Sequence, residues 1–266
     1  MAVDFFDSTY CERKQFWQRR RVARFFDFLF DLRITPRIQA VQQSAEQRPR
    51  RDVLVATVSV PQRAANLGVV LAEFNRSRHR VSVCATPMGD RGKFDNINVA
   101  LHGYELDRFD WLVVTDDDVR LPPRFLDTFL FVAEAMNLKI AQPAHCCRSY
   151  ATFTFSYRKW NSLGRATRYV ESGPITAFHR DVIPHVLPFP ALRWGWGTDI
   201  AWSVAAERQG MSIGIVDCTP IEHLKPVAKN YPVASAIAEA RTFLTDCDIA
   251  PVREEMFVDM RVLQKV

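Results

Sequence analysis

Three consecutive carboxylates, placed almost directly after a short apolar run, constrain the fold of this chain more than any other feature. Residues 111–114 are Trp-Leu-Val-Val, and Asp116, Asp117 and Asp118 follow after one threonine. Neighbouring carboxylates repel one another and are costly to bury, so a strand that ends in them needs a cation nearby. Mg²⁺ and Mn²⁺ prefer oxygen ligands and often bind phosphates as well. The pattern predicts a metal–phosphate site at the carboxyl edge of an α/β sheet, where such folds bind ligands. The alternative is a solvated acidic turn that caps a helix beginning near Pro122.

Apolar, β-rich runs alternate with helical patterns in the first half of the chain. We expect strands at residues 53–58, 81–85, 111–114 and 139–143. Helices are expected around residues 67–74, from about 95 to 106, and from Pro122 to about 132. This alternation predicts the α/β class, with a doubly wound sheet flanked by helices.

From residue 151 the pattern predicts a mixed sheet. Strands are expected at residues 152–157, 168–171, 175–178 and 212–219. Helices are expected at about 198–208, where the Thr198 hydroxyl is suited to cap the first turn, and at about 233–244 before an irregular end. We divide the chain into an N-terminal extension with a linker (residues 1–50), a main domain (51–230) and a helical tail packed on it (231–266).

The N-terminal extension contains an amphipathic helical pattern over residues 16–32. One face carries Val22, Phe25, Phe26, Leu29 and Leu32, and the opposite face carries Arg20, Arg24, Asp27 and Asp31. Such a helix either packs its aromatic face against the main domain or lies on an anionic membrane surface. The two acids favour packing. Residues 42–51 are polar and basic and are typical of a linker.

Composition sets broad limits on partners and location. The net charge of +5 suits nucleotides or an anionic membrane surface, and no nucleic-acid-binding motif accompanies it. The six cysteines lack zinc spacing, which suggests free thiols in a reducing compartment. We find no secretory signal and no run of roughly 18 apolar residues. We therefore expect a cytoplasmic protein, with a peripheral position at the inner membrane face as the variant that the N-terminal helix allows.

A second cluster, Trp-Gly-Trp-Gly-Thr-Asp at residues 194–199, has the composition of a sugar pocket. Glycines let the backbone approach a ligand, and the Trp194 and Trp196 rings offer flat walls. Asp199 is placed in the first turn of the next helix, where a carboxylate is held rigidly and is suited to act as a general base. Gly197 and Thr198 complete the predicted pocket. The alternative is a tight turn with two packed aromatic residues and an acid that only caps the helix.

Several basic and polar residues are candidates for nucleotide contacts. His223 ends the strand expected in the second half of the chain and is a candidate metal ligand, and Lys225 is suited to neutralise a diphosphate. The loop at residues 89–93 lacks the glycine spacing of the P-loop and dinucleotide motifs. It still offers Lys93 as a phosphate contact. Arg63, Asn96 and Asn98 are further candidates for nucleotide binding.

Taken in order, these segments give the chain a family resemblance. It resembles the GT-A-fold glycosyltransferases, in particular family-2-like enzymes, and is similar to a plant and microbial family of uncharacterised glycosyltransferase domains. The matching segments are residues 53–63, 92–98, 113–122, 173–178, 195–199 and 216–223. The resemblance spans about residues 53–225 and leaves out the N-terminal helix and the tail.

The resemblance implies roles for individual residues. Asp118 corresponds to the acid that binds the metal, Asp116 to the acid that contacts the ribose or the metal, and Asp117 to a variable position. Asp199 matches the catalytic base of inverting members, and His223 matches a late histidine that completes the metal site. Thr198 stands where many relatives carry glutamate, which leaves the acceptor contact and the identity of the base open.

We therefore expect a hexosyltransferase that uses Mn²⁺ or Mg²⁺ and moves a sugar from a nucleotide-diphosphate sugar to an acceptor hydroxyl, with inversion. The acceptor is a glycan, a lipid or a small molecule. Trp160 is a further candidate for the wall of the pocket. The alternatives are a nucleotidyltransferase or sugar-phosphate enzyme, and a non-catalytic, membrane-associated binding module that uses the N-terminal helix.

Overall fold

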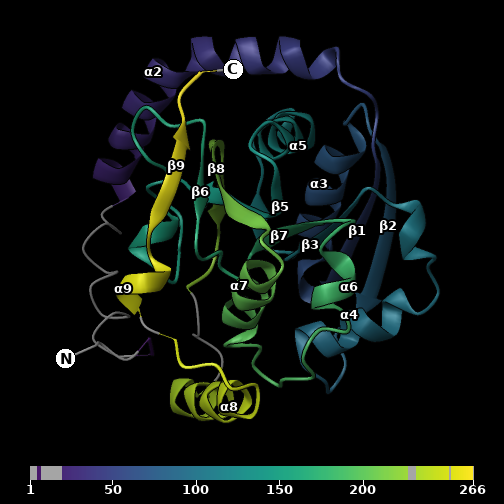
Figure 1. Cartoon of the computed structure of the whole chain (residues 1–266). Helices are drawn as coiled ribbons and strands as arrows, with labels where there is room; N and C mark the ends of the chain where they lie inside the picture. Colours follow the sequence, from purple (N-terminus) through teal and green to yellow (C-terminus); the bar gives the residue numbers. More distant parts are fainter. Residues whose placement is uncertain (1–4, 7–19, 227–231, 252, 266) are drawn as a thin grey trace.

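The computed structural model in Figure 1 describes residues 5–6, 20–226, 232–251 and 253–265. A mixed sheet runs through the middle of the molecule in the order β2-β1-β3-β7-β5-β8-β6-β9, and the short β4 pairs with β8 outside this path. The strands are β1 (Asp52–Ser59), β2 (Arg80–Pro87), β3 (Trp111–Thr115), β4 (Val119–Arg120), β5 (Leu138–His145), β6 (Gly164–Thr167), β7 (Ile175–His179), β8 (Ser212–His223) and β9 (Asp259–Leu263). β1, β2 and β3 are parallel, as are β5 and β8, while β7 lies antiparallel between β3 and β5. The expected α/β class, with a mixed sheet flanked by helices, is confirmed.

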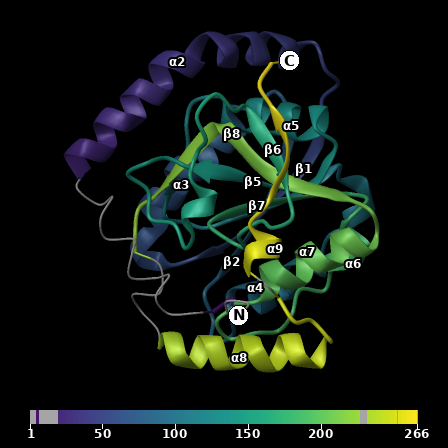
Figure 2. The ribbon, with the colours of Figure 1, turned by 60° about the vertical axis from the view of Figure 1, so that its left-hand side comes forward.

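Helices cover both faces of this sheet (Figures 1 and 2). One face carries α2 (Arg20–Glu46), α3 (Ala64–Asn75) and α5 (Phe125–Ala135), and the other carries α4 (Lys93–Leu101), α6 (Ile183–Val186) and α7 (Thr198–Arg208). The sheet residues alternate between the two cores: Val53 and Val55 pack in the first, and Leu54 and Ala56 in the second. This alternation follows from the two-residue period of a strand, and it explains why residues 53–56 of β1 are all apolar.

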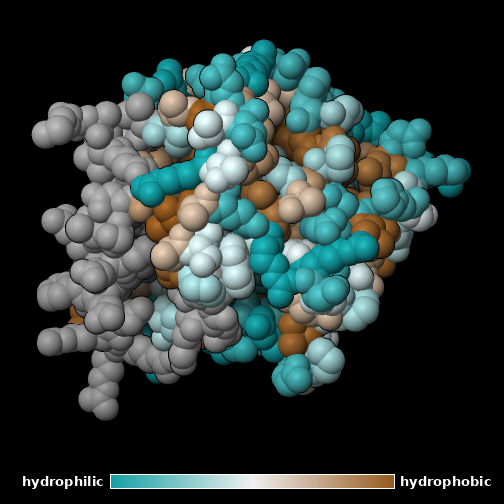
Figure 3. All heavy atoms as spheres, turned by 90° about the horizontal axis from the view of Figure 1, so that it is seen from below, coloured by the Kyte–Doolittle hydropathy of each residue, from teal (hydrophilic) through white to brown (hydrophobic). Residues whose placement is uncertain are grey.

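The remaining elements lie at the edges of these layers. α8 (Val233–Asp246) lies beyond α7 in both ribbon views, and α9 (Arg253–Met256) precedes β9. Short 3₁₀ helices occupy loops of the described chain: η2 (Pro61–Arg63), η3 (Leu106–Arg108) and η4 (Thr154–Ser156). Ala240 and Leu244 of α8 pack in a third apolar cluster with Phe5 and Tyr169. The face on the α8 side is mostly hydrophilic, with apolar residues in small separate groups (Figure 3).

Several expected boundaries are wrong. Residues 152–157 contain η4 rather than a strand, and residues 168–171 follow β6 instead of forming a strand of their own. α5 begins at Phe125 and not at Pro122, because Arg124 adopts a left-handed backbone conformation immediately before it. The end of the tail is β9, which pairs antiparallel with β6. Its apolar residues Met260 and Val262 are exposed, so no buried apolar face marks this strand, and the sheet edge that accepts it had to be known first.

The N-terminal helix departs furthest from expectation. α2 continues to Glu46, so the first half of the predicted linker, residues 42–46, is helical. Its buried face carries Ala23, Asp27, Ile34 and Val41, whereas the aromatic face expected to pack on the domain is exposed. The described start of the helix is Arg20, so the expected residues 16–19 lie outside the described part of the chain.

Ion pairs set the rotational phase of α2. Asp27 accepts hydrogen bonds from the Cys147 backbone N–H at 2.7 Å and from Arg148 Nη1 at 3.0 Å, and Arg158 Nη1 lies 3.7 Å from it. Arg158 is itself buried. A buried guanidinium without a counter-ion is strongly unfavourable, so these contacts favour the acidic side of the helix as the inner side.

A pair of substitutions tests this phase. Asp27→Ala leaves the buried Arg158 with Asp31 as its remaining carboxylate and should lower the free energy of unfolding by about 3 kcal/mol. Phe28→Ala, one residue away on the exposed side, should change it by less than about 0.5 kcal/mol. Urea unfolding of both variants is the measurement. A larger cost for Phe28→Ala would contradict the observed phase.

Candidate functional site

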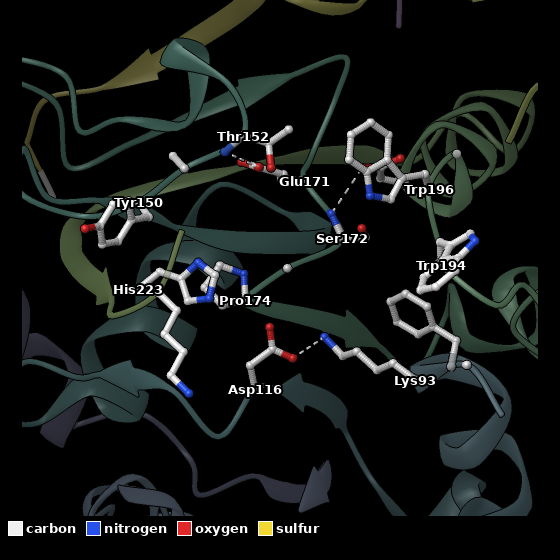
Figure 4. A pocket seen from close by; sticks show the side chains of 18 of the residues that line it. Lys93, Asp116, Tyr150, Thr152, Glu171, Ser172, Pro174, Trp194, Trp196 and His223 are labelled. Carbon is white, nitrogen blue, oxygen red and sulfur yellow. Dashed lines mark hydrogen bonds and ion pairs between the residues drawn. The ribbon is translucent and has the colours of Figure 1, made fainter. Parts of the chain in front are cut away.

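A cavity of about 570 Å³ opens at the carboxyl edge of β1 and β3, beside the end of β8. Its volume lies within the usual range for ligand pockets. The acidic lining residues are Asp116, Asp118, Glu171 and Asp199, and the basic ones are Arg63, Arg91, Lys93, Arg193, His223 and Lys225. The aromatic lining residues are Phe5, Phe6, Phe94, Tyr150, Phe153, Trp194 and Trp196. Figure 4 shows His223 and Asp116 on one side of this space and the two tryptophans on the other.

Asp116, Asp118 and His223 form a cluster that could hold a metal ion, with candidate ligand atoms within 4.8 Å of one another. Both acids follow β3, while His223 is the last residue of β8. The two-residue strand β4 joins them, because Val119 pairs antiparallel with His223 and the Leu224 N–H donates to the Asp118 carbonyl at 2.9 Å. Backbone pairing therefore brings together residues that are a hundred positions apart in the sequence.

Cations surround the three carboxylates. Arg63 Nη1 lies 2.6 Å from Asp117 Oδ1 and 2.9 Å from Asp118 Oδ2, and Lys93 Nζ lies 2.6 Å from Asp116 Oδ1. His223 Nε2 lies 3.2 Å from Asp118 Oδ1. These contacts offset the repulsion among the carboxylates and the cost of burying two of them.

The same contacts shift protonation equilibria. Burial alone would raise the pKa of Asp118, but the hydrogen bond and charge of His223, with Arg63 and Lys225, outweigh burial and lower that pKa. Burial alone would lower the pKa of His223, but the hydrogen bond that His223 donates to Asp118 and the charges of Asp116 and Asp118 outweigh burial and raise that pKa. Asp118 is thus held as the carboxylate, the form in which an acid binds a metal.

The donor set fits a divalent cation. Two carboxylates and one imidazole match the preferences of Mn²⁺, and carboxylates alone would also suit Mg²⁺. His223 Nδ1 is buried, and no described residue forms a hydrogen bond with it. Asp117 points elsewhere, since it accepts a hydrogen bond from the Val60 N–H at 3.2 Å and is absent from the cavity lining. Asp117 therefore holds the backbone after β1 and the Arg63 side chain in place, and it does not face a ligand.

Asp199 stands on the opposite side of the cavity, in the first turn of α7. Its Oδ2 accepts a hydrogen bond from the Tyr169 hydroxyl at 2.6 Å and a longer one from the Ser172 N–H at 3.4 Å. Burial raises the pKa of Asp199, and the Tyr169 hydroxyl acts in the opposite direction. A carboxylate with a raised pKa is a stronger base than one in water.

The expected cap of α7 is wrong. The N-cap is Gly197, with φ of 85°, and no side chain caps the helix. The Thr198 hydroxyl is buried without a hydrogen-bond partner among the described residues, and Thr198 does not line the cavity. The left-handed conformation at Gly197, and at Gly195 with φ of 74°, explains why glycines alternate with the tryptophans.

The tail of the chain holds the tryptophan loop. Glu239 of α8 accepts hydrogen bonds from the backbone N–H groups of Arg193 at 2.7 Å and Trp194 at 2.9 Å. Gly197 packs against Ala240 and Leu244 of the same helix. α8 therefore supports the wall of the cavity from outside, although the sequence patterns gave it no role in the site.

Three further candidate residues lie outside the cavity lining. Asn96 donates to the Gly92 carbonyl at 3.1 Å, and Asn98 bonds the backbone of Phe189 on both its N–H and carbonyl sides. Trp160 contacts Phe30 of α2, with ring centroids 4.4 Å apart, so its placement in the wall of the pocket is wrong. Trp160 instead lines a separate small pocket with Phe30, Ile34 and Arg37 of α2.

Sequence patterns missed Glu171 and Tyr169. Glu171 lines the cavity, and its Oε1 accepts a hydrogen bond from the Thr152 N–H at 2.8 Å (Figure 4). His145 Nε2 lies 3.9 Å from Glu171 Oε2, and burial lowers the pKa of His145 to about 3, so this ring is neutral. Tyr169 and Glu171 both fall in residues 168–171, whose sequence is typical of an ordinary strand. Such a pattern gives no indication of a functional site.

Replacement of single acids tests the metal site. Asp118→Asn should weaken Mn²⁺ binding at least about tenfold, because it removes a charged ligand. Asp117→Asn, a matched neighbour outside the cavity lining, should weaken binding less. Titration with Mn²⁺ followed by electron paramagnetic resonance measures both affinities. Equal affinities in the two variants would contradict the assigned cluster.

Comparison with known proteins gives only distant structural likeness. No protein-family model matches the chain, and no curated protein matches it by sequence. The catalytic domain of Drosophila β1,4-galactosyltransferase 7, solved with xylobiose, is 14% identical with a TM-score of 0.47, over 71% of this chain and 80% of that one. GalNAc-T7, solved with UDP, GalNAc and Mn²⁺, is 9% identical with a TM-score of 0.47, over 69% and 45%. S. aureus TarS 1–349 is 9% identical with a TM-score of 0.46, over 64% and 59%. These values are too low to assign a family or a function.

Proposed function

We propose that this chain is a metal-dependent glycosyltransferase of the hexosyltransferase type. It moves a sugar from a nucleotide-diphosphate sugar to an acceptor hydroxyl, with inversion at the anomeric carbon. The observation that carries the proposal is that one cavity joins the Asp116, Asp118 and His223 cluster to Asp199 and two tryptophans. A transferase of this kind needs both halves: one that binds a diphosphate and one that binds and activates a hydroxyl.

The first half suits a diphosphate. Lys93, Arg63 and Lys225 line it and supply positive charge toward phosphate oxygens. A divalent ion held by Asp116, Asp118 and His223 would supply charge neutralisation for the diphosphate leaving group. Lys93 and Arg63 are paired with the carboxylates, so both lie directly beside the cluster that would hold the metal.

The second half suits a sugar and an acceptor hydroxyl. Trp194 and Trp196 offer flat apolar faces that pack against the C–H groups of a sugar ring. Asp199 accepts the proton of the acceptor hydroxyl, which then attacks the anomeric carbon from the face opposite the leaving group. Tyr169 orients the Asp199 carboxylate through its hydroxyl. Thr198 contributes no polar group to the cavity, whereas Asp199 lines it. We therefore assign Asp199 as the base.

Measurements of donor binding and of turnover test the two halves of the cavity separately. Titration calorimetry with a panel of UDP-, GDP- and dTDP-sugars should give heat that requires Mn²⁺ or Mg²⁺ and that Asp118→Asn abolishes. Asp199→Asn should keep donor binding within about threefold and lower kcat by about 10²–10⁴-fold, the range for loss of a general base.

The alternatives give different results in the same titration. A nucleotidyltransferase or sugar-phosphate enzyme would bind nucleoside triphosphates or sugar phosphates in preference to nucleotide-diphosphate sugars. A non-catalytic module would bind no donor with or without metal, and that outcome would overturn the proposal.

Removal of the Tyr169 hydroxyl should change the pH profile. The base must be ionised to accept a proton, so activity is lost as the pH falls through the pKa of Asp199. Tyr169→Phe removes a hydrogen bond that lowers this pKa, so the pKa rises and the acidic limb of kcat/KM should move to higher pH. Tyr157→Phe is the matched control, because the Tyr157 hydroxyl bonds the Ser149 carbonyl instead. An unshifted limb in Tyr169→Phe would remove Asp199 as the base.

A further inference from the structure

The outward face of α2 exposes large apolar side chains that the proposed function does not use. Phe25, Phe28 and Leu32 are 58%, 61% and 66% exposed, and Val22 and Phe26 are exposed beside them. Their spacing of three and four residues places them along one side of the helix. Figures 1 and 2 show α2 lying across the outside of the molecule.

The helix cannot turn this face inward. Its opposite side is fixed by the contacts of Asp27 with Arg148 and Arg158, and by Ile34 and Val41 in the main core. Burying the phenylalanines would expose that apolar core and break a buried ion cluster. The outward face is therefore a permanent feature of this fold.

Charge on α2 is distributed unevenly. The two acids nearest the aromatic side chains are paired toward the domain, Asp27 with Arg148 and Asp31 with Arg158 Nη2 at 2.8 Å. Arg24 is exposed beside the aromatic side chains, and Arg33, also exposed, reaches Asn161 at 2.7 Å. An apolar aromatic face flanked by arginines matches the interface between headgroups and acyl chains of an anionic bilayer.

The other exposed large apolar residues are aliphatic, apart from Trp160, which packs on Phe30 of α2. Val69, Met88 and Val99 lie on separate segments, and Val258, Met260 and Val262 alternate along the short edge strand β9 and the residue before it. On the α8 side, apolar residues form only small separate groups (Figure 3). None of the described helices is long and apolar enough to cross a membrane.

We propose that α2 lies on an anionic lipid surface, with Phe25, Phe28 and Leu32 inserted among the lipids and its arginines near the headgroups. This inference is independent of the proposed transferase activity. It concerns the outward face of α2, and the cavity at the carboxyl edge of the sheet plays no part in it.

Vesicle sedimentation tests the proposal. The whole protein is mixed with vesicles of phosphatidylcholine alone or with about a third of phosphatidylglycerol. We expect binding to the anionic vesicles that weakens as salt increases, because the arginine contribution is screened. The triple variant Phe25→Ser, Phe28→Ser, Leu32→Ser should reduce the partition coefficient at least about tenfold.

A matched control tests whether vesicle binding depends on this face of α2 or on exposed apolar side chains in general. The double variant Val69→Ser, Met260→Ser removes equally exposed apolar side chains from α3 and β9 and should bind vesicles as the wild type does. Urea unfolding of the triple variant should match the wild type, which shows that lost binding does not come from lost folding.

Three outcomes overturn the proposal. The first is a wild-type protein that does not sediment with anionic vesicles, and the second is equal binding by the triple variant. The third is sedimentation equilibrium showing a wild-type dimer that the triple variant converts to monomer, since the face would then be covered by a second copy of the chain.

Discussion

The ion pairs around the three carboxylates after β3 are the interaction on which the rest of the site depends. Asp116, Asp117 and Asp118 repel one another, and the chain tolerates them because Lys93 comes from α4 and Arg63 from the loop after β1. His223 comes from the end of β8. One cluster of charges thus joins segments from across the domain. A ligand with phosphate oxygens, or a divalent ion, would enter a place where the compensating charges are already assembled.

The opposite wall of the cavity depends on backbone conformation. The left-handed glycines at 195 and 197 turn the chain sharply, so that Asp199, in the first turn of α7, lines the same cavity as Trp194 and Trp196. Glu239 of α8 holds this turn, because its carboxylate accepts hydrogen bonds from two backbone N–H groups of the turn. Chemistry proposed for the site therefore requires the tail of the chain, although no reacting group comes from it.

Much of the architecture could be predicted from sequence, and the failures have a common cause. α7 begins and ends where its pattern predicts, and β1, β3 and β7 lie within a residue or two of expectation, because their apolar periods are strong. The prediction that the aromatic face of α2 packs inward is wrong. That face is the more apolar one, but the buried Arg158 pairs with Asp27 on the other side of the helix, and no pattern within the helix indicates that distant partner.

By itself the sequence determined the class of the fold, the strand that ends in carboxylates and the glycine–tryptophan turn before Asp199, since each of these follows from short-range periodicity and backbone freedom. Only the tertiary structure decided that His223 meets Asp118, because their contact depends on the pairing of β4 with β8. It also brought Tyr169 to Asp199, moved Trp160 to α2 and left the aromatic face of that helix exposed. These outcomes depend on contacts between segments that are far apart in the chain, and a local pattern of residues carries no information about such partners.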